Sequence, residues 1–172
     1  MNIIKITISF LAIVTFSSLM LSKIQANNFE KIQLIDNDYY INDLKLQDFD
    51  GNYYFLRDKR AKFYIINLWA SWCAPCVKEM GSLNSLQKKL TDIVVITISE
   101  DSEIEAAQNF FKKNNYVHLE KYYDFNKDFI SKIQIRGLPT TFIANEEYKI
   151  FAKVEGAIDW DSKEFVEWLY SN

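Results

Sequence analysis

The chain has 172 residues, of which 49% are hydrophobic, 16% aromatic and 25% charged, and this composition excludes a disordered or low-complexity chain. The formal net charge is -3, so the protein lacks the positive excess that neutralises a nucleic-acid backbone, and we expect no nucleic-acid partner. Its only two cysteines, Cys73 and Cys76, cannot build a framework of structural disulfides.

The N-terminus carries an apolar segment. Residues 6–22 contain no charge, are flanked by lysines and precede a small residue, Ala26, which is the pattern of a secretory signal. The apolar run is also close to the length of a membrane-spanning helix, and it is apolar on all sides, which disfavours a buried amphipathic helix. We expect residues 1–26 to be either a signal peptide or an N-terminal membrane anchor. Residues 27–172 would then lie in the periplasm, soluble or anchored in the inner membrane.

The first predicted elements of this domain are a hairpin and a buried strand. After a polar lead-in, residues 44–46 and 53–56 flank an Asp-Gly pair at 50–51, which predicts a turn because glycine accepts a positive φ. Residues 63–69 are almost continuously apolar, as expected of a strand covered on both faces. This strand should be the centre of the sheet.

Two helices and a second strand are predicted in the middle of the chain. Apolar residues recur at helical spacing and predict a helix with one buried face: Val77, Met80, Leu83, Leu86 and Leu90. Residues 93–98 predict a second buried strand. Ser102 and Glu105 form a capping-box pattern, which predicts the start of a further helix.

The last third of the chain predicts a short helix, two strands and a final helix. The short helix would run through residues 129–133, and residues 140–144 and 149–154 read as strands joined by a tight connection. The last helix should begin near Asp161. Alternating strands and helices indicate an α/β fold whose central mixed sheet is parallel in its first half and carries an antiparallel pair at its end.

The two cysteines lie where the central strand passes into its helix. Two residues between Cys73 and Cys76 allow the sulfurs to close a small ring and to reopen it. In the first turn of a helix Cys73 would face unpaired N–H groups and the positive end of the helix dipole, which favour the reactive thiolate. Pro75 suits this turn because its missing N–H is not needed there. The pair therefore predicts a redox-active disulfide.

Three alternatives to a redox pair are less favoured. A zinc site needs about four ligands, and His118 is the only histidine. A copper site would need a nearby histidine or methionine, and Met80 falls on the predicted buried face of the helix. A structural disulfide across so short a loop would stabilise the fold little. We expect no metal and no cofactor.

Two motifs resemble the thioredoxin superfamily. Residues 72–76 (Trp-Cys-Ala-Pro-Cys) look like its active-site motif, and residues 137–142 (Gly-Leu-Pro-Thr-Thr-Phe) resemble its cis-proline loop. The chain is most similar to the exported TlpA/ResA-type thiol:disulfide oxidoreductases. Asn67 stands where thioredoxin has a buried aspartate, and Glu79 stands where the subfamily has an active-site glutamate. The resemblance covers about residues 38–170.

This resemblance implies a thioredoxin fold with a central mixed sheet flanked by helices, an N-terminal β-hairpin and a central helical insert. It also implies a set of site residues, namely catalytic Cys73, Cys76 and Glu79 and substrate-binding Trp72, Pro75, Leu138 and Pro139. Glu79 would manage the proton of the buried sulfur, with a solvated surface carboxylate as the alternative. Asp159 and Trp160 also fit the subfamily, whereas Gly81 departs from it, because relatives commonly carry a helix-kinking proline there.

The implied activity is thiol:disulfide exchange outside the cytoplasm. Cys73, the more exposed sulfur, would attack a partner's disulfide, and Cys76 would resolve the mixed disulfide. The partner would be an exported protein with a disulfide or thiol pair, of the cytochrome c maturation or copper-site assembly type. A membrane thiol-disulfide protein would donate electrons. A disulfide oxidase or isomerase of folding proteins is the alternative, and a non-catalytic copper-delivery module is a further one.

Overall fold

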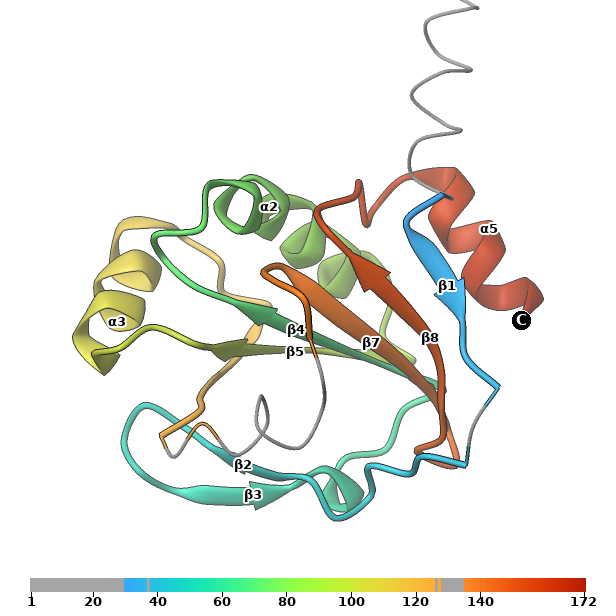
Figure 1. Ribbon diagram of the computed structural model, residues 1–172, viewed down its shortest axis with the longest axis horizontal. Coiled ribbons are helices and arrows are strands. Elements are labelled where there is room, and N and C mark those ends of the chain that lie inside the picture. Colours follow the sequence, from blue (N-terminus) through green and yellow to red (C-terminus); the bar gives the residue numbers. More distant parts are fainter. Residues whose placement is uncertain (1–29, 37, 126, 128–134) are drawn as a thin grey trace, which may run out of the picture. The chain divides into compact units, whose positions relative to one another are not determined.

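The structure is a computed structural model that describes residues 30–36, 38–125, 127 and 135–172 (Figure 1). Its strands are β1 (Ile32–Leu34), β2 (Lys45–Gln47), β3 (Tyr53–Phe55), β4 (Phe63–Trp69), β5 (Ile93–Ser99), β6 (Glu120–Tyr123), β7 (Thr140–Asn145) and β8 (Ile150–Glu155). Its helices are α2 (Ala74–Lys89), α3 (Ile104–Lys113) and α5 (Lys163–Ser171), with a short 3-10 turn, η1, at Leu56–Asp58. The chain divides into two compact units, Met1–Lys31 and Ile32–Asn172, and every element named above belongs to the second.

Two predicted segments lie outside the described residues. These are the signal peptide or membrane anchor at residues 1–26 and the short helix at residues 129–133. Within the part of the chain that the structure describes, no helix has both the length and the apolar character needed to cross a membrane.

A six-stranded mixed sheet forms the centre of the fold (Figure 1). Its strand order is β1-β8-β7-β4-β5-β6. Strands β4, β5 and β6 run parallel, whereas β7 and β8 pair antiparallel with their neighbours. Strands β2 and β3 form the predicted hairpin as a separate two-stranded sheet, and Gly51 in its turn has a φ of +88°. The predicted α/β architecture is confirmed, with β4 inside the sheet.

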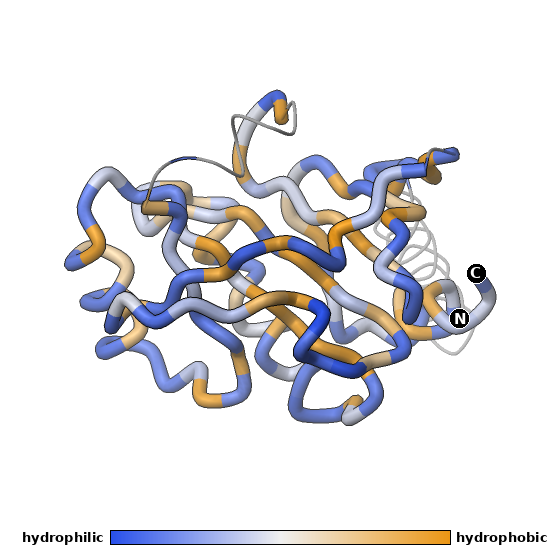
Figure 2. Tube along the Cα trace, turned by 90° about the horizontal axis from the view of Figure 1, so that it is seen from below, coloured by the Kyte–Doolittle hydropathy of each residue, from blue (hydrophilic) through white to orange (hydrophobic). Residues whose placement is uncertain are grey.

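Both faces of β4 are covered, which explains its continuous run of apolar residues. Ile65 and Trp69 face a cluster of buried side chains to which α2, α3 and α5 contribute. Tyr64, Ile66 and Leu68 face a second cluster, which includes side chains from the hairpin and the 3-10 turn that follows it. Figure 2 shows hydrophobic residues along the strands in the middle of this unit and hydrophilic residues in its outer turns. Because neither face of β4 is exposed to solvent, polar residues do not alternate with apolar ones along this strand.

The buried face of α2 differs from the predicted one. Met80 is fully buried as expected, but Val77 is 36% exposed, and Cys76 and Glu79 occupy the buried positions in that part of the helix. The prediction for Val77 was wrong because the helical spacing was traced through apolar side chains only. A disulfide-bonded cysteine and a hydrogen-bonded carboxylate fill the core there instead. The helix continues through Gly81.

The structure corrects the predicted start of α3 and agrees with the predicted start of α5 near Asp161. The cap residue of α3 is Glu103, with no side-chain cap, so the predicted capping box of Ser102 is wrong. The backbone carbonyl of Ser102 instead accepts the Tyr123 hydroxyl at 3.0 Å, which holds the chain outside the helix. Helix α5 is capped by Ser162, whose Oγ accepts from the backbone N–H of Phe165.

Candidate active site

The loop between β4 and α2 is held on the end of β5. The backbone N–H of Ser71 donates to the Asp101 carboxylate at 3.1 Å, and the Ser71 hydroxyl donates to it at 2.8 Å. Asp101 is buried and also accepts from the hydroxyl of Ser99. Because Ser71 directly precedes Trp72 and Cys73, this carboxylate helps to fix the chain where it enters α2.

Cys73 and Cys76 form a disulfide at the start of α2. Cys73 is the N-cap residue, and its Sγ accepts the backbone N–H of Cys76 at 3.3 Å. Pro75 occupies the first turn, as predicted. Cys73 is 5% exposed and Cys76 is 0% exposed, so the first sulfur is the more accessible one. The helix terminus and this N–H together favour a negative charge on Cys73 once the disulfide is opened.

The surface next to Cys73 is apolar. The side chain of Trp72 is 70% exposed, and Pro75 and Val77 also face solvent. Exposed aromatic and apolar side chains around a reactive atom offer a contact surface for another molecule. The exposure of Val77, which was not expected from its helical spacing, adds to this surface.

The proline loop reaches the same end of the sheet. The register pairs Thr140 of β7 with Leu68 of β4, which places Pro139 beside the end of β4. The Leu138–Pro139 peptide is cis, as the resemblance predicts. The carbonyl of Pro139 accepts from the N–H of Gly156 at 2.9 Å, which joins the loop to the residues after β8. The tertiary structure thus brings together two motifs that lie far apart in the sequence.

Glu79 is buried, so the alternative of a solvated surface carboxylate is wrong. Its Oε1 accepts from Asn67 Nδ2 at 2.8 Å. Its Oε2 accepts from Trp160 Nε1 at 2.8 Å and from the N–H of Ile158 at 3.3 Å. The amide of Asn67 donates in addition to Thr141 Oγ1 at 2.8 Å. A carboxylate with several donors is therefore held on the helix face that also carries Cys76, one turn away.

A second acidic group flanks the loop at the ends of β5 and β6. The backbone N–H of Glu100 donates to the carbonyl of Trp69 at 2.8 Å, and the Glu100 carboxyl lies 3.4 Å from Lys127 Nζ. Burial, and after it the charge of Asp124, raises the pKa of Glu100 to about 8, while Lys127 acts in the opposite direction. Burial thus favours the protonated form of Glu100 next to the loop that carries the cysteines.

We expect this carboxyl to make the fold less stable as the pH rises. Its folded pKa of about 8 lies above the ordinary value of 4.5, so its contribution is complete below pH 4.5 and is lost as the pH rises through 8. In this window the free energy of unfolding should fall by up to about 1.4 kcal/mol per pH unit. Urea unfolding of Glu100→Gln should show a flatter pH profile. The exposed Glu105→Gln control should keep the steep profile, and an unchanged Glu100→Gln profile would contradict the assignment.

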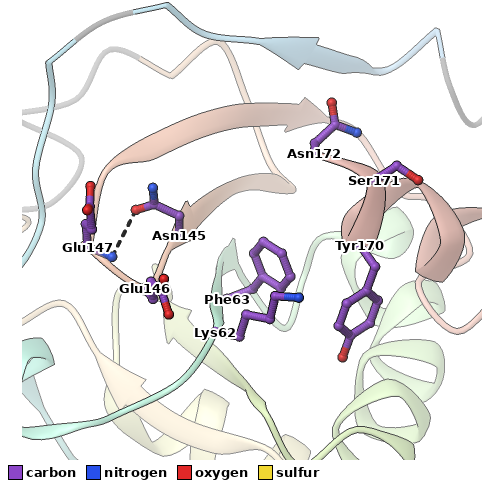
Figure 3. A pocket seen from close by; sticks show the side chains of 8 residues that line it. All are labelled: Lys62, Phe63, Asn145, Glu146, Glu147, Tyr170, Ser171 and Asn172. Carbon is purple, nitrogen blue, oxygen red and sulfur yellow. Dashed lines mark hydrogen bonds between the residues drawn. The ribbon is translucent and has the colours of Figure 1, made fainter.

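A hollow at the other end of β4 is separate from the cysteines (Figure 3). Its lining residues are Lys62, Phe63, Asn145, Glu146, Glu147, Tyr170, Ser171 and Asn172. Phe63 begins β4 and the cysteines follow its last residue, so a strand of roughly 20 Å lies between the two places. One lining residue, Tyr170, already has a structural contact, because its hydroxyl donates to Asp92 at 2.6 Å.

The sequence profile of the AhpC/TSA family matches residues 39–153, well over half of the chain. The chain belongs to the AhpC/TSA family. Relatives named thiol-disulfide oxidoreductase ResA include one from Bacillus subtilis (strain 168), 31% identical over 117 residues, and one from Bacillus anthracis, 30% identical over 112 residues. These matches cover 66% and 63% of this chain, and the chain spans 64% of the length of each relative.

Solved structures confirm the thioredoxin-like fold of this AhpC/TSA-family protein. The thioredoxin domain of a thiol-disulfide oxidoreductase from Bacteroides vulgatus superposes with a TM-score of 0.67 at 20% identity, covering 80% of this chain and 99% of that one. An exposed lipoprotein thioredoxin from Streptococcus pneumoniae gives 0.66 at 24% identity, covering 76% and 99%. A secreted disulfide oxidoreductase from Mycobacterium tuberculosis gives 0.64 at 15% identity, covering 76% and 96%.

Sequence reasoning assigned no contact to two residues of this AhpC/TSA-family site. Asp101 could have been suspected, because Glu100 and Asp101 directly follow β5, and the carboxyl ends of parallel strands meet at one edge of a sheet. Trp160 was matched to the subfamily, but its contact with Glu79 could not be predicted, because the two residues are 81 positions apart in the sequence. The remaining site residues lie on the loop, on α2 or on the proline loop, as predicted.

Proposed function

We propose that the protein is a thiol-disulfide oxidoreductase that acts outside the cytoplasm and reduces disulfides of exported proteins. The observation that carries this proposal is the disulfide at the N-terminus of α2, in which Cys73 is slightly exposed and Cys76 is fully buried. The names of the ResA relatives support the activity. The secreted and exposed proteins among the similar structures, together with the apolar segment in residues 6–22, support the location.

The proposed reaction starts from the reduced pair. The Cys73 thiolate attacks one sulfur of the substrate disulfide, a mixed disulfide forms, and the other substrate sulfur leaves as a thiolate and takes a proton. Cys76 then attacks the Cys73 sulfur, which breaks the mixed disulfide and releases the second substrate thiolate, and this also takes a proton. Two electrons have passed to the substrate, and the Cys73–Cys76 disulfide has formed again. A dithiol on a membrane protein would return two electrons and become a disulfide itself.

We assign the remaining site residues to binding and to proton transfer. Trp72 and Pro75 would give the substrate an apolar contact, because both face solvent beside the disulfide. The backbone of Leu138, next to Pro139, would pair with an extended stretch of substrate chain. Glu79 would exchange the proton of Cys76, since both are buried on the same face of α2. A cytochrome c apoprotein or a copper-site assembly protein, each with a thiol pair, fits this role.

The reduction potential of the full chain tests the direction of electron flow. Equilibration with dithiothreitol or glutathione buffers, followed by alkylation of free thiols, measures the ratio of reduced to oxidised protein. A value near about -270 mV, as for thioredoxin, is expected of a reductase. A value near about -120 mV would instead indicate an oxidase of folding proteins and would overturn the reductase proposal.

A further inference from the structure

Trp160 lies before α5 and joins the C-terminal part of the chain to α2. Its side chain is fully buried, and its Nε1 donates to Glu79 Oε2 at 2.8 Å. Its backbone N–H donates to Ser82 Oγ at 3.3 Å, and the Ser82 hydroxyl donates in turn to the carbonyl of Glu79 at 2.8 Å. The N–H of Ile158 adds a further bond to the same carboxylate oxygen as the indole. Trp160 therefore binds the side chain of Glu79 directly and its backbone through one serine.

These contacts favour the charged form of Glu79. An ionised carboxylate only accepts hydrogen bonds, and each donor that points at it stabilises the charge. The indole N–H and the amide of Asn67 approach different oxygens, so both halves of the carboxylate have a donor. A phenylalanine would fill much of the same core volume without a buried nitrogen. The core could therefore be filled without the nitrogen of Trp160, whose distinct contribution is the hydrogen bond to Glu79.

Glu79 and the resolving cysteine share one buried face of α2. Cys76 and Glu79 are three residues apart in α2, which places their side chains on one helix face, and both are buried. Asp159 adjoins Trp160 in sequence, but it is exposed and interacts with Asp161, which pairs with Lys89 at 2.7 Å. Of these groups, Glu79 is the buried carboxyl, and its charge acts on Cys76 with little screening.

We propose that Trp160 is a positioning residue of the redox site, whose indole N–H holds the Glu79 carboxylate beside Cys76 and keeps it charged. By doing so it determines the pH range in which Cys76 gives up and takes back its proton during thiol exchange. This inference rests on the proposed oxidoreductase function and adds the regulation of its buried thiol. Glu79 would exchange the proton of Cys76, whereas Trp160 acts only through Glu79.

The variant Trp160→Phe tests this role, because it removes the nitrogen and keeps an aromatic ring. Loss of a charge-assisted hydrogen bond should move the titration of the Glu79 carboxyl in reduced protein upward by about one pH unit, measured by carbon-13 NMR. The pH at which the reduction potential changes slope should move in the same direction. Trp168→Phe is the matched control, since Trp168 lies on α5 at the edge of the same cluster, and it should leave both titrations unchanged.

An unchanged Glu79 titration in folded Trp160→Phe would overturn the inference. If this variant fails to fold, the same titrations are made with a benzothiophene analogue of tryptophan at position 160, which keeps the shape of the indole and lacks the N–H. An unchanged titration there would equally overturn it. The NMR titration needs no substrate, so it separates this inference from the proposed function: wild-type protein without reductase activity would refute the function alone.

Discussion

Replacement of Cys76 by serine is expected to arrest the protein as a covalent adduct with its substrate. Cys73 can still attack a disulfide, because its position at the helix cap and the N–H of residue 76 that points at its sulfur do not depend on the second thiol. The mixed disulfide then persists, since the hydroxyl of serine does not attack it. Purification of Cys76→Ser from cells under non-reducing conditions, followed by mass spectrometry, should identify the trapped partner.

Cys73→Ser is the matched control for the trapping experiment. It keeps the other cysteine but removes the accessible one, so we expect no adduct and at least a roughly thousandfold loss of insulin-reducing activity. A Cys76→Ser protein that traps nothing, while Cys73 still reacts with an alkylating agent, would contradict a protein disulfide as the substrate. Adducts of equal yield in both variants would contradict the assignment of Cys73 as the attacking residue.

Trp69→Ala is expected to lower the free energy of unfolding by about 3–5 kcal/mol. The side chain is fully buried at the end of β4, and its ring centroid lies 4.8 Å from that of Phe110 and 5.3 Å from that of Phe111. Its loss would leave a cavity between the sheet and α3. Because domains of this size are stable by only about 5–15 kcal/mol, urea denaturation should show a large shift of the midpoint.

Trp72→Ala gives the opposite result in the same assays. This tryptophan is three residues from Trp69 but is 70% exposed, so its replacement should change the free energy of unfolding by less than about 0.5 kcal/mol. The rate of reduction of a protein disulfide should fall, because the apolar surface beside Cys73 is lost. Equal destabilisation by Trp69→Ala and Trp72→Ala would contradict the packing described for β4 and α3.

Sequence analysis predicted best the elements that have a strong local signal, either a continuous run of apolar residues or a recognisable turn. The range predicted for β4 agrees with the structure, because a strand covered on both sides must be apolar at nearly every position. The strands β7 and β8 were found as a pair through their tight connection. The hairpin was found through its Asp-Gly turn.

The elements that it missed have little apolar signal of their own. β1 has only three residues at the edge of the sheet, and Leu34 is 67% exposed, so nothing in its composition distinguishes it from the polar lead-in. β6 begins with Glu120, whose side chain pairs with Lys59. Both strands exist because a neighbouring strand, β8 or β5, offers free backbone groups at its edge.

The amino-acid sequence by itself determined the chemistry of the site. The spacing of Cys73 and Cys76 at a strand-to-helix junction, and the later Leu138-Pro139 pair, are local features that do not depend on distant contacts. Only the tertiary structure decided the surroundings of these groups. It buries Glu79 beneath three donors and ties Ser71 to Asp101, 30 positions away. Such contacts arise where the packing of β4, β5 and α2 brings side chains together. They join residues far apart in the sequence, so no local sequence pattern predicts them.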